Sequence, residues 1–378
     1  MDNNLYIINA TATKYGGALT ILKGFLSETN KFDRKSLYYV FCGIDLDEFV
    51  SDNIEIVKVK TNGFGIGGIK RIFWDVLGLF LYCKKNQINP NLIISFQNTG
   101  VFYPKVKQLI YYHQSIPLFN HKWKFYRKDE SVLFFYKEIY PLFIRLMLNK
   151  NTEFVVQQEF LKKVFSAKFH ISEEKIHTIV PDVNLKFESQ IKKIVLDERK
   201  FHIFYPTNLA KYKNYYVLFE AISEIKKMSP EISEKLILHI TLDKNNEYLK
   251  HKISKFQISD NLNLLGTIPY NEVISYYNSV NLLVFPSYIE TLGLPLIEAA
   301  YFGLPILVSD LDYARELLHE YKGVTFVQYD DVVKWANAII ELSKTHQKVD
   351  SFKVYSINNS MSKFLELSNE IINNNVQK

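Results

Sequence analysis

The chain has 378 residues, of which 47% are hydrophobic and 23% charged, and its formal net charge is +6. This length predicts two domains, and the ordinary balance of apolar and charged residues excludes a disordered chain. Cys42 and Cys83 are the only cysteines, which excludes a zinc ribbon or a CxxC redox motif. The chain contains no run of 18 apolar residues and begins with a strand pattern, so we expect a cytoplasmic protein without a membrane-spanning helix.

In the first half of the chain, short apolar runs alternate with longer helical patterns, which is typical of β-α-β units. A helix is expected from Ala18 to about Thr29, and further helices over 69–85 and 131–149. The near-continuous apolar runs predict a parallel sheet that is covered on both faces. Its strands are expected at 5–10, 36–42, 54–59, 92–96, 109–113 and 153–157.

A polar stretch near 185–200 lacks a clear period and predicts a domain boundary. After it the strand–helix alternation begins again, with a last helical tail from about 331. The strands are expected at 201–206, 235–241, 261–266, 281–287 and 305–310, and the helices at 214–228, 245–254, 271–280 and after Leu294.

These patterns predict three parts of the chain. Residues 1–190 form an N-terminal domain, and residues 198–355 form a C-terminal domain. Residues 356–378 form a helical tail that could cross back to the N-terminal domain. The expected fold class is α/β, with two Rossmann-like doubly wound domains facing each other across a cleft. In such sheets ligands bind at the carboxyl ends of the strands.

The most informative segment is 285–310, FPSYIETLGLPLIEAAYFGLPILVSD. A strand ends at Ser287, a loop carries Glu290, and a helix that begins after Leu294 carries Glu298. The first turn of such a helix has unpaired backbone N–H groups and the positive end of the helix dipole, which suits a phosphate. A carboxylate one turn further on can accept two hydroxyls, as a ribose diol presents them.

This segment resembles the E-x7-E motif of retaining glycosyltransferases with the GT-B fold, the glycosyltransferase group 1 family that includes glycogen synthases and lipopolysaccharide glycosyltransferases. The matching positions are Pro286, Ser287, Glu290, Gly293, Pro295, Glu298, Ala299, Gly303 and Pro305. A solvent-exposed pair of glutamates on an ordinary β-α unit is the alternative, and it leaves the matching loop glycine and helix unexplained.

The resemblance implies roles for the residues of this segment. Glu298 would bind the ribose hydroxyls, whereas Glu290 would bind the sugar hydroxyls and stabilise positive charge at the anomeric carbon. Thr291, Leu292 and Gly293 would contact the donor, and the amides of Leu292 and Gly293 would stabilise the departing diphosphate together with Lys213. Cationic groups and the helix dipole would take the place of a metal, so a metal-independent reaction without a cofactor is expected, with the nucleotide diphosphate sugar as donor substrate.

Other segments resemble the same family. Lys213 stands where the family has the lysine that contacts the donor diphosphate. Asn208 stands where many members have an arginine, which leaves one cation fewer beside the diphosphate. Gly266 matches a glycine near the nucleotide base.

The resemblance is weaker across residues 1–190. It implies that this domain binds the acceptor and that residues 198–355 bind the nucleotide sugar. Gly16 and Gly17 resemble the first glycine loop of the family, in which the backbone approaches the donor phosphate or the acceptor. A simple tight turn accounts for these two glycines equally well. His113 follows a predicted strand, where family members often have a histidine that reaches the donor sugar, and a structural histidine is the alternative.

Two further segments allow more than one interpretation. Gly63, Gly65 and Gly68 form a GxGxxG pattern, but no acidic residue follows the next strand, so we interpret them as a loop. Residues 119–150 hold seven Lys and Arg against three Asp and Glu, with aromatic residues that include Trp123, Phe125, Tyr126, Phe134 and Phe135. This segment could lie on an anionic membrane surface, or it could be a helix with a solvated basic face and a buried aromatic one.

The sequence as a whole predicts a hexosyltransferase that moves sugar from a nucleotide sugar to a glycan or lipid-linked acceptor. Bacterial surface polysaccharide assembly, such as that of O-antigen or capsule, at the inner face of the plasma membrane is the expected setting. No nucleic-acid-binding motif accompanies the positive charge. A sugar-nucleotide 2-epimerase of the same fold, or a non-catalytic sugar-nucleotide or carbohydrate-binding protein, are the alternatives.

Overall fold

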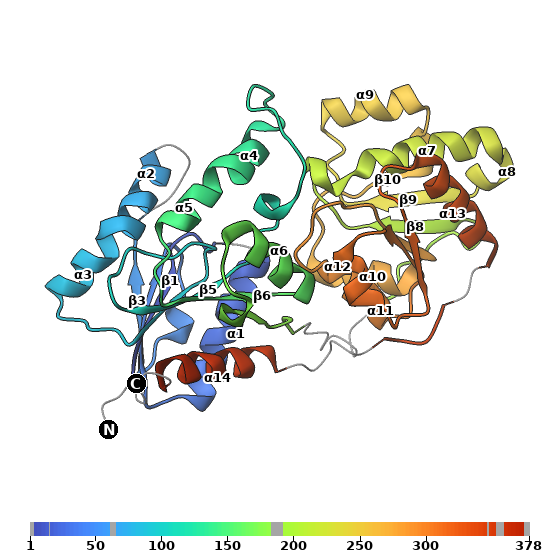
Figure 1. Cartoon of the computed structure of the whole chain (residues 1–378). Helices are drawn as coiled ribbons and strands as arrows, with labels where there is room; N and C mark the ends of the chain where they lie inside the picture. Colours follow the sequence, from blue (N-terminus) through green and yellow to red (C-terminus); the bar gives the residue numbers. More distant parts are fainter. Residues whose placement is uncertain are drawn as a thin grey trace. The chain divides into compact units, whose positions relative to one another are not determined.

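The computed structural model describes residues 4–14, 16–60, 66–182, 192–345, 348–352 and 359–373. The chain forms two compact units, each with its own parallel sheet (Figure 1). The N-terminal unit consists of Met1–Asp182 together with Asn358–Lys378, and the C-terminal unit is Val183–Ile357. Among the described residues, none of the helices combines the length and the apolar character that crossing a membrane requires.

The N-terminal unit contains a seven-stranded sheet in the order β3-β2-β1-β4-β5-β6-β7, and all neighbouring strands are parallel. The order reverses between β1 and β4, which is the point where open α/β sheets bind ligands. The strands are β1 (Leu5–Ala10), β2 (Leu37–Cys42), β3 (Ile54–Lys58), β4 (Leu92–Ser95), β5 (Lys107–Tyr111), β6 (Thr152–Val156) and β7 (Ile176–Thr178).

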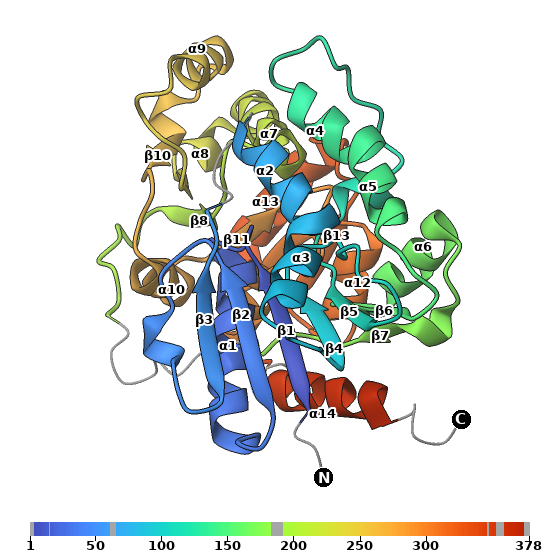
Figure 2. The ribbon, with the colours of Figure 1, turned by 90° about the vertical axis from the view of Figure 1, so that its left-hand side faces the viewer.

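Helices cover both faces of this sheet. Alternate residues of β1 point to opposite faces, because side chains alternate along a strand. Tyr6 and Ile8 pack in one core cluster with residues of α1 (Gly16–Phe32) and α14 (Ser360–Asn373). Ile7 packs in another cluster with residues of α3 (Leu79–Lys85). The C-terminal helix α14 is therefore part of the N-terminal unit and lies along α1 (Figures 1 and 2).

The face on which Ile7 lies is covered by two long helices, and each of them contains a π-helical turn. The first runs through α2 (Ile66–Phe73), the π-helical segment Trp74–Gly78 and α3. The second runs through α4 (Ser131–Phe134), the π-helical segment Phe135–Ile139 and α5 (Tyr140–Leu146). π-Helical turns are rare and occur frequently at functional sites. The helix α6 (Glu159–Phe169) completes this face.

The C-terminal unit contains a six-stranded parallel sheet in the order β10-β9-β8-β11-β12-β13. Its order reverses between β8 and β11, so a ligand site is expected at the carboxyl ends of these two strands. The strands are β8 (Phe201–Tyr205), β9 (Leu236–Ile240), β10 (Leu262–Leu264), β11 (Leu282–Phe285), β12 (Ile306–Ser309) and β13 (Val324–Val327).

Helices pack on both sides of this sheet as well. Figure 1 shows α7 and α13 on one side and α10, α11 and α12 on the other. The helices are α7 (Tyr215–Met228), α8 (Pro230–Ser233), α9 (Glu247–Phe256), α10 (Tyr270–Ser279), α11 (Leu294–Tyr301), α12 (Asp312–Leu318) and α13 (Val332–Thr345). Both units thus have the doubly wound α/β architecture that the strand and helix patterns predict.

Some elements differ from the sequence-based prediction. The helical tail expected from about 331 is two separate helices, α13 in the C-terminal unit and α14 in the N-terminal unit. The short strands β7 and β13 were not predicted, because three or four half-buried residues give no clear period. The expected helices over 69–85 and 131–149 are present, but each is interrupted by its π-helical turn.

Candidate active site

Lys213 and Glu290 form an ion pair at the carboxyl ends of β8 and β11. The Lys213 Nζ lies 2.6 Å from the Glu290 Oε1, and the two side chains are only 18% and 12% exposed. Burial alone would lower the pKa of Lys213, but the attraction to Glu290 outweighs it, so this pKa lies above its usual range. The lysine therefore carries its charge at every physiological pH.

Neighbouring residues hold the loop around Lys213 in place. Asn214 adopts a left-handed conformation with φ of 54°, and its side-chain amide donates hydrogen bonds to the carbonyls of Pro286 and Tyr329 at 3.2 and 2.7 Å. The hydroxyl of Tyr205 donates to the Lys213 carbonyl at 2.6 Å. These bonds tie the loop after β8 to the loop after β11, so the position of the ion pair is set by both strands.

Glu298 lies in α11 and is buried, with 6% of its surface exposed. The hydroxyl of Tyr270 donates a hydrogen bond to Oε1 at 2.6 Å, and that of Tyr277 donates to Oε2 at 2.9 Å. Burial raises the pKa of Glu298, and the two tyrosine hydrogen bonds oppose that rise. Each carboxylate oxygen has two lone pairs, so each can accept one further hydroxyl. The geometry suits the recognition of a diol.

The amino end of α11 lies between the two glutamates in sequence. Gly293 precedes the helix with φ of 84°, a left-handed conformation that favours glycine. No side chain caps the first turn, and that turn contains no acidic residue. The backbone amides at this end are therefore oriented to bind an anion. Thr291 is half-buried and Leu292 is buried in the loop that leads into the helix.

The structure places two other predicted residues at the same edge of the C-terminal sheet. Gly266 follows β10 with φ of 68°, and a side chain added there would meet open space. Asn208 lies exposed in the loop after β8, and its side-chain oxygen accepts a hydrogen bond from the amide of Ala210 at 2.9 Å. Asn208 thus stabilises a local turn.

The N-terminal unit has a pocket of about 200 Å³ at the carboxyl ends of β1, β4 and β5. His113, two residues after β5, lines it together with Asn98, whose side-chain oxygen accepts from the His113 amide at 2.6 Å. Burial lowers the pKa of His113 to about 4, although the backbone of Tyr111 opposes this shift. The histidine is therefore neutral at pH 7 and can bind a sugar hydroxyl without adding charge.

Gly16 and Gly17 begin α1 beside this pocket, since Ala18 in the same turn lines it. A side chain added at either glycine would meet no other atom, so neither is required by close packing. Gly16 has φ of 69°, which favours glycine at the start of the helix.

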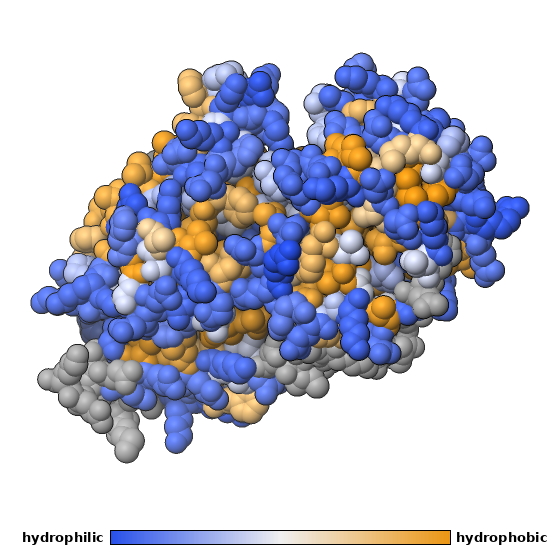
Figure 3. Space-filling model, turned by 45° about the vertical axis from the view of Figure 1, so that its right-hand side comes forward, coloured by the Kyte–Doolittle hydropathy of each residue, from blue (hydrophilic) through white to orange (hydrophobic). Residues whose placement is uncertain are grey.

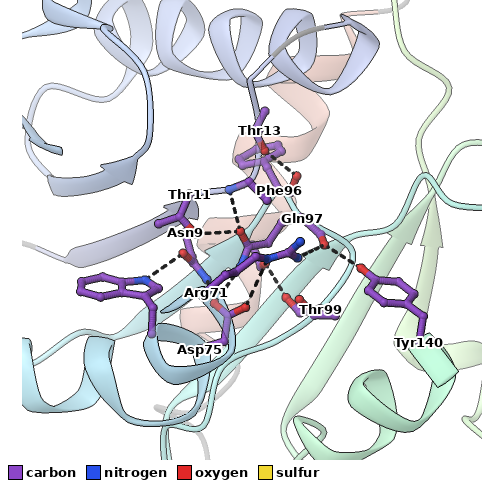
Figure 4. A network of polar contacts seen from close by, with 12 residues as sticks. Asn9, Thr11, Thr13, Arg71, Asp75, Phe96, Gln97, Thr99 and Tyr140 are labelled. Atoms are coloured by element: carbon purple, nitrogen blue, oxygen red, sulfur yellow. Dashed lines mark hydrogen bonds and ion pairs between the residues drawn. The ribbon is translucent and has the colours of Figure 1, made fainter. Parts of the chain in front are cut away.

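A buried polar network lies next to the residues that line the pocket (Figure 4). The side-chain oxygen of Gln97 accepts hydrogen bonds from the Thr11 hydroxyl and the Ala12 amide, both at 3.1 Å, while its nitrogen donates to Asp75 at 2.8 Å. The side chain of Asn9 also donates to Asp75, at 3.0 Å. Gln97 thereby connects the loop after β1 with the π-helical segment.

Arg71 and Asp75 are the charged members of this network. The Arg71 Nε lies 3.7 Å from the Asp75 Oδ2, and Arg71 also donates to the Gln97 carbonyl at 3.4 Å. Burial raises the pKa of Asp75 to about 6, although Arg71 and the amides of Asn9 and Gln97 oppose that rise. Arg71 lines the pocket, whereas Asp75 lies behind it and is buried.

The predicted residues thus fall into two groups, one in each unit. The structure brings Lys213 into contact with Glu290, but Glu298 bonds to tyrosines. Gly63 and Gly65 of the GxGxxG pattern lie outside the described residues, and Gly68 lies in α2. Sequence reasoning missed the partners that hold these groups, which are Asn9, Arg71, Asp75, Gln97, Asn214, Tyr270 and Tyr277. Asp75 had a signal, since it is the one charged residue between Arg71 and Lys84.

Comparison with known proteins finds similar glycosyltransferases. The O-antigen chain mannosyltransferase RfbU of Salmonella typhimurium is 24% identical over 318 residues, which cover 80% of this chain and 79% of the relative. The crystal structure of a glycosyltransferase from Rickettsia africae has a TM-score of 0.70 at 14% identity and covers 98% of this chain and 99% of its own. Anabaena HepE, solved with UDP and glucose, has a TM-score of 0.63 at 13% identity, with 99% and 100% covered.

Two parallel Rossmann-like units, which the solved glycosyltransferases share, give the chain the GT-B fold. The profile of the family described as "Glycosyl transferases group 1" matches residues 186–358, which span the C-terminal unit. The C-terminal unit thus matches glycosyltransferase group 1.

Proposed function

We propose that this glycosyltransferase moves a hexosyl group from a nucleotide diphosphate sugar to a glycan or lipid-linked acceptor, with retention at the anomeric carbon. The observation that carries the proposal is the Lys213–Glu290 ion pair beside the uncapped amino end of α11 at the β8–β11 switch point. The names of the relatives support the donor and the setting, because HepE was solved with UDP and glucose and RfbU is an O-antigen mannosyltransferase.

The C-terminal unit would bind the donor through three groups. The Glu298 carboxylate accepts the two ribose hydroxyls. Lys213 and the amides of Leu292 and Gly293 neutralise the diphosphate. Glu290 accepts hydroxyls of the sugar and stabilises the positive charge that develops at the anomeric carbon. Gly266 would lie on the base side of this site, and Asn208 would add no charge beside the diphosphate.

Transfer would then follow a front-face course. The bond between the anomeric carbon and the diphosphate oxygen breaks, and its electron pair leaves with the diphosphate. The acceptor hydroxyl forms the new bond on the same face, and its proton passes to the departing phosphate oxygen. Lys213 and the helix dipole supply the positive charge that this step requires, so we expect EDTA to leave turnover unchanged.

A donor-binding experiment tests this proposal. We expect one of UDP-, GDP- or dTDP-sugars to raise the melting temperature of the wild-type chain, because ligands that bind only the folded state stabilise it. Glu298→Gln should lose this protection and the turnover of the donor, while Glu341→Gln, an exposed glutamate on α13, should keep both. Full protection and turnover in Glu298→Gln would contradict the proposal. Conversion of the donor to an epimer without an acceptor would favour the 2-epimerase.

The second part of the proposal is contact with the inner face of the plasma membrane through the segment 119–150. The outer face of α4 to α5 carries a regular apolar stripe with spacings of three and four residues, and Leu146 is 71% exposed. Hydrophobic side chains also reach the surface in Figure 3. The stripe consists of Val132, Phe135, Ile139, Leu142 and Leu146.

The loop before this helix combines apolar and basic side chains. Phe125 and Tyr126 are both about two-thirds exposed, and Trp123 is buried. Four exposed cations, Lys122, Lys124, Arg127 and Lys128, accompany them, against the exposed Asp129. An apolar stripe flanked by cations is complementary to anionic lipid. The alternative of a solvated basic face with a buried aromatic one shares the exposed cations, but Phe125 and Tyr126 are exposed and not buried.

Vesicle sedimentation tests this contact. We expect the chain to bind vesicles that contain phosphatidylglycerol and not vesicles of phosphatidylcholine alone. Leu142→Ser combined with Leu146→Ser should weaken binding by about tenfold, since each removes exposed apolar area that would be buried in lipid. Val333→Ser, at a similarly exposed position on α13, is the matched control. Equal binding to both kinds of vesicle, or no effect of the double substitution, would contradict membrane contact.

A further inference from the structure

We propose that the pocket of the N-terminal unit is a binding site for a negatively charged group of the acceptor, a carboxylate or a phosphate on the sugar that receives the transferred residue. This inference rests on the proposed function and adds to it the chemical class of the acceptor. Lys14 and Arg71 would bind the anion directly.

The charges that line this pocket are all positive. Lys14 lies in the loop after β1 and Arg71 in α2, and both line the pocket. No aspartate or glutamate is among the lining residues. Ala18 places the first turn of α1 at the pocket, and this 17-residue helix has no acidic residue in its first turn. The positive end of its dipole therefore adds to the two side-chain cations.

Arg71 is held in place for this task. Asp75 contacts its Nε from behind at 3.7 Å, and the Gln97 carbonyl accepts from another guanidinium nitrogen at 3.4 Å. A guanidinium has five N–H groups, so these contacts leave donors for a ligand. Asp75 is itself bound by the amides of Asn9 and Gln97, which anchors the arginine without placing a carboxylate in the pocket.

The remaining lining groups suit the neutral part of a sugar. Tyr136 and Tyr140 come from the helix on one side, and the half-buried Tyr136 ring can pack on the face of a sugar. Asn98, His113 and Gln114 offer uncharged donors and acceptors for hydroxyls. A volume of about 200 Å³ limits the occupant to one sugar-sized group. A uronate or a sugar phosphate combines these features.

Calorimetric titration of the full chain tests this inference with three probes, glucose 6-phosphate, glucuronate and neutral glucose. We expect the two charged sugars to bind at least tenfold more tightly than glucose, and the tighter of the two identifies the phosphate or the carboxylate as the preferred group. Lys14→Gln and Arg71→Gln should each weaken this binding by about tenfold, the effect expected from losing one charge-assisted hydrogen bond. Lys70→Gln removes the same charge from the adjacent, exposed residue of α2 and should change nothing.

Two additional measurements keep the outcome decisive. Arg71→Gln combined with Asp75→Asn removes both partners of the ion pair, so no buried carboxylate is left without its cation. Lys14 lies in a loop outside the network, so Lys14→Gln leaves the network intact. Equal affinity for glucose and both anions, or an equal loss in Lys70→Gln, would overturn the inference. It would also fail if Arg71→Gln weakened UDP or GDP as much as the sugar anions, because the cations would then serve the donor. Loss of nucleotide binding in Glu298→Gln tests the proposed function separately.

Discussion

At the scale of single residues, the pairing of Lys213 with Glu290 determines what the C-terminal site can do. Both side chains are largely buried, so both lose hydration. Each therefore depends on the other for electrostatic stabilisation. Such a pair contributes little net stability, but it keeps a cation and a carboxylate adjacent without a ligand. A bound diphosphate and sugar can then replace the internal contact with contacts of their own.

We expect stability and activity to separate in a double-mutant cycle on this pair. Lys213→Gln and Glu290→Gln should each lower the free energy of unfolding by about 1–3 kcal/mol, because each leaves a buried charge without its partner. The double variant should lose less than the sum of the two, yet its turnover should stay at least about 100-fold below wild type. Urea unfolding and donor turnover measure the two effects. Additive losses of stability, or recovery of turnover in the double variant, would contradict the roles assigned here.

At the scale of elements, a chain of hydrogen bonds joins three neighbouring strands of the C-terminal sheet. The side-chain amide of Asn263 on β10 lies 3.0 Å from the Nδ1 of His239 on β9, whose Nε2 lies 2.9 Å from the Nδ1 of His202 on β8. The His202 Nε2 reaches the carbonyl of Asp197 at 2.9 Å. With both rings neutral, every atom in the chain has a partner. A second proton on either ring would place two donors face to face.

This chain predicts the pH dependence of stability. Burial, with a further contribution from His202, lowers the pKa of His239 to about 4. Between about pH 6.5 and 4 the unfolded chain therefore binds a proton that the folded chain does not, and stability falls as the pH falls. Thermal melting at pH 7.5 and 5 should show a larger loss in wild type than in His239→Gln. His319→Gln, an exposed histidine, should match wild type, and an equal loss in all three would refute this origin.

The turn between α11 and β12 requires a glycine. Gly303 has φ of 65°, and a Cβ there would lie 2.2 Å from the Val349 carbonyl oxygen. Gly303→Ala should lower the free energy of unfolding by about 2–4 kcal/mol, since left-handed strain and a backbone clash add together. Gly17→Ala, in α1 with open space around it, should be neutral or stabilising by up to about 1 kcal/mol. Chemical denaturation compares the two, and equal effects would contradict this reading of the turn.

At the scale of the whole molecule, the last helix of the chain completes the core of the first unit. Phe364 of α14 is fully buried, and its ring contacts those of Phe25, Phe96 and Tyr111 at centroid distances of 5.3–5.9 Å. The C-terminal unit is therefore inserted between two parts of the N-terminal unit along the chain.

We expect Phe364→Ala to destabilise only the N-terminal unit, by about 3–5 kcal/mol, because it leaves a cavity in that core. Hydrogen exchange should then become faster in β1 and α1 but not in β8 to β12. Phe32→Ala, at the exposed end of α1, is the control. Faster exchange in both units would show that the two cores do not unfold separately.

The sequence predicted the repeated β-α units because parallel strands buried on both faces are continuously apolar, as in LYIINA and NLLVFPS. The segment around Glu290 and Glu298 was predicted as a site because a loop glycine and a helix start follow a strand within a few residues. Local patterns could not predict that Lys213, 77 residues earlier, pairs with Glu290, nor that Tyr270 and Tyr277 bind Glu298. Such partners depend on the order of the strands.

The sequence by itself therefore determined the fold class, the family resemblance and the two glutamates, since all of these are encoded in short continuous segments. Only the tertiary structure decided that Asp75, an isolated charge in an apolar helix, anchors Arg71 beside the loops of Lys14 and His113. It also decided that the apolar residues of α4 and α5 face outward. Both features depend on contacts between distant parts of the chain. Parallel strands bring together loops that are far apart in the sequence, and the exposure of a helix depends on which neighbours cover it.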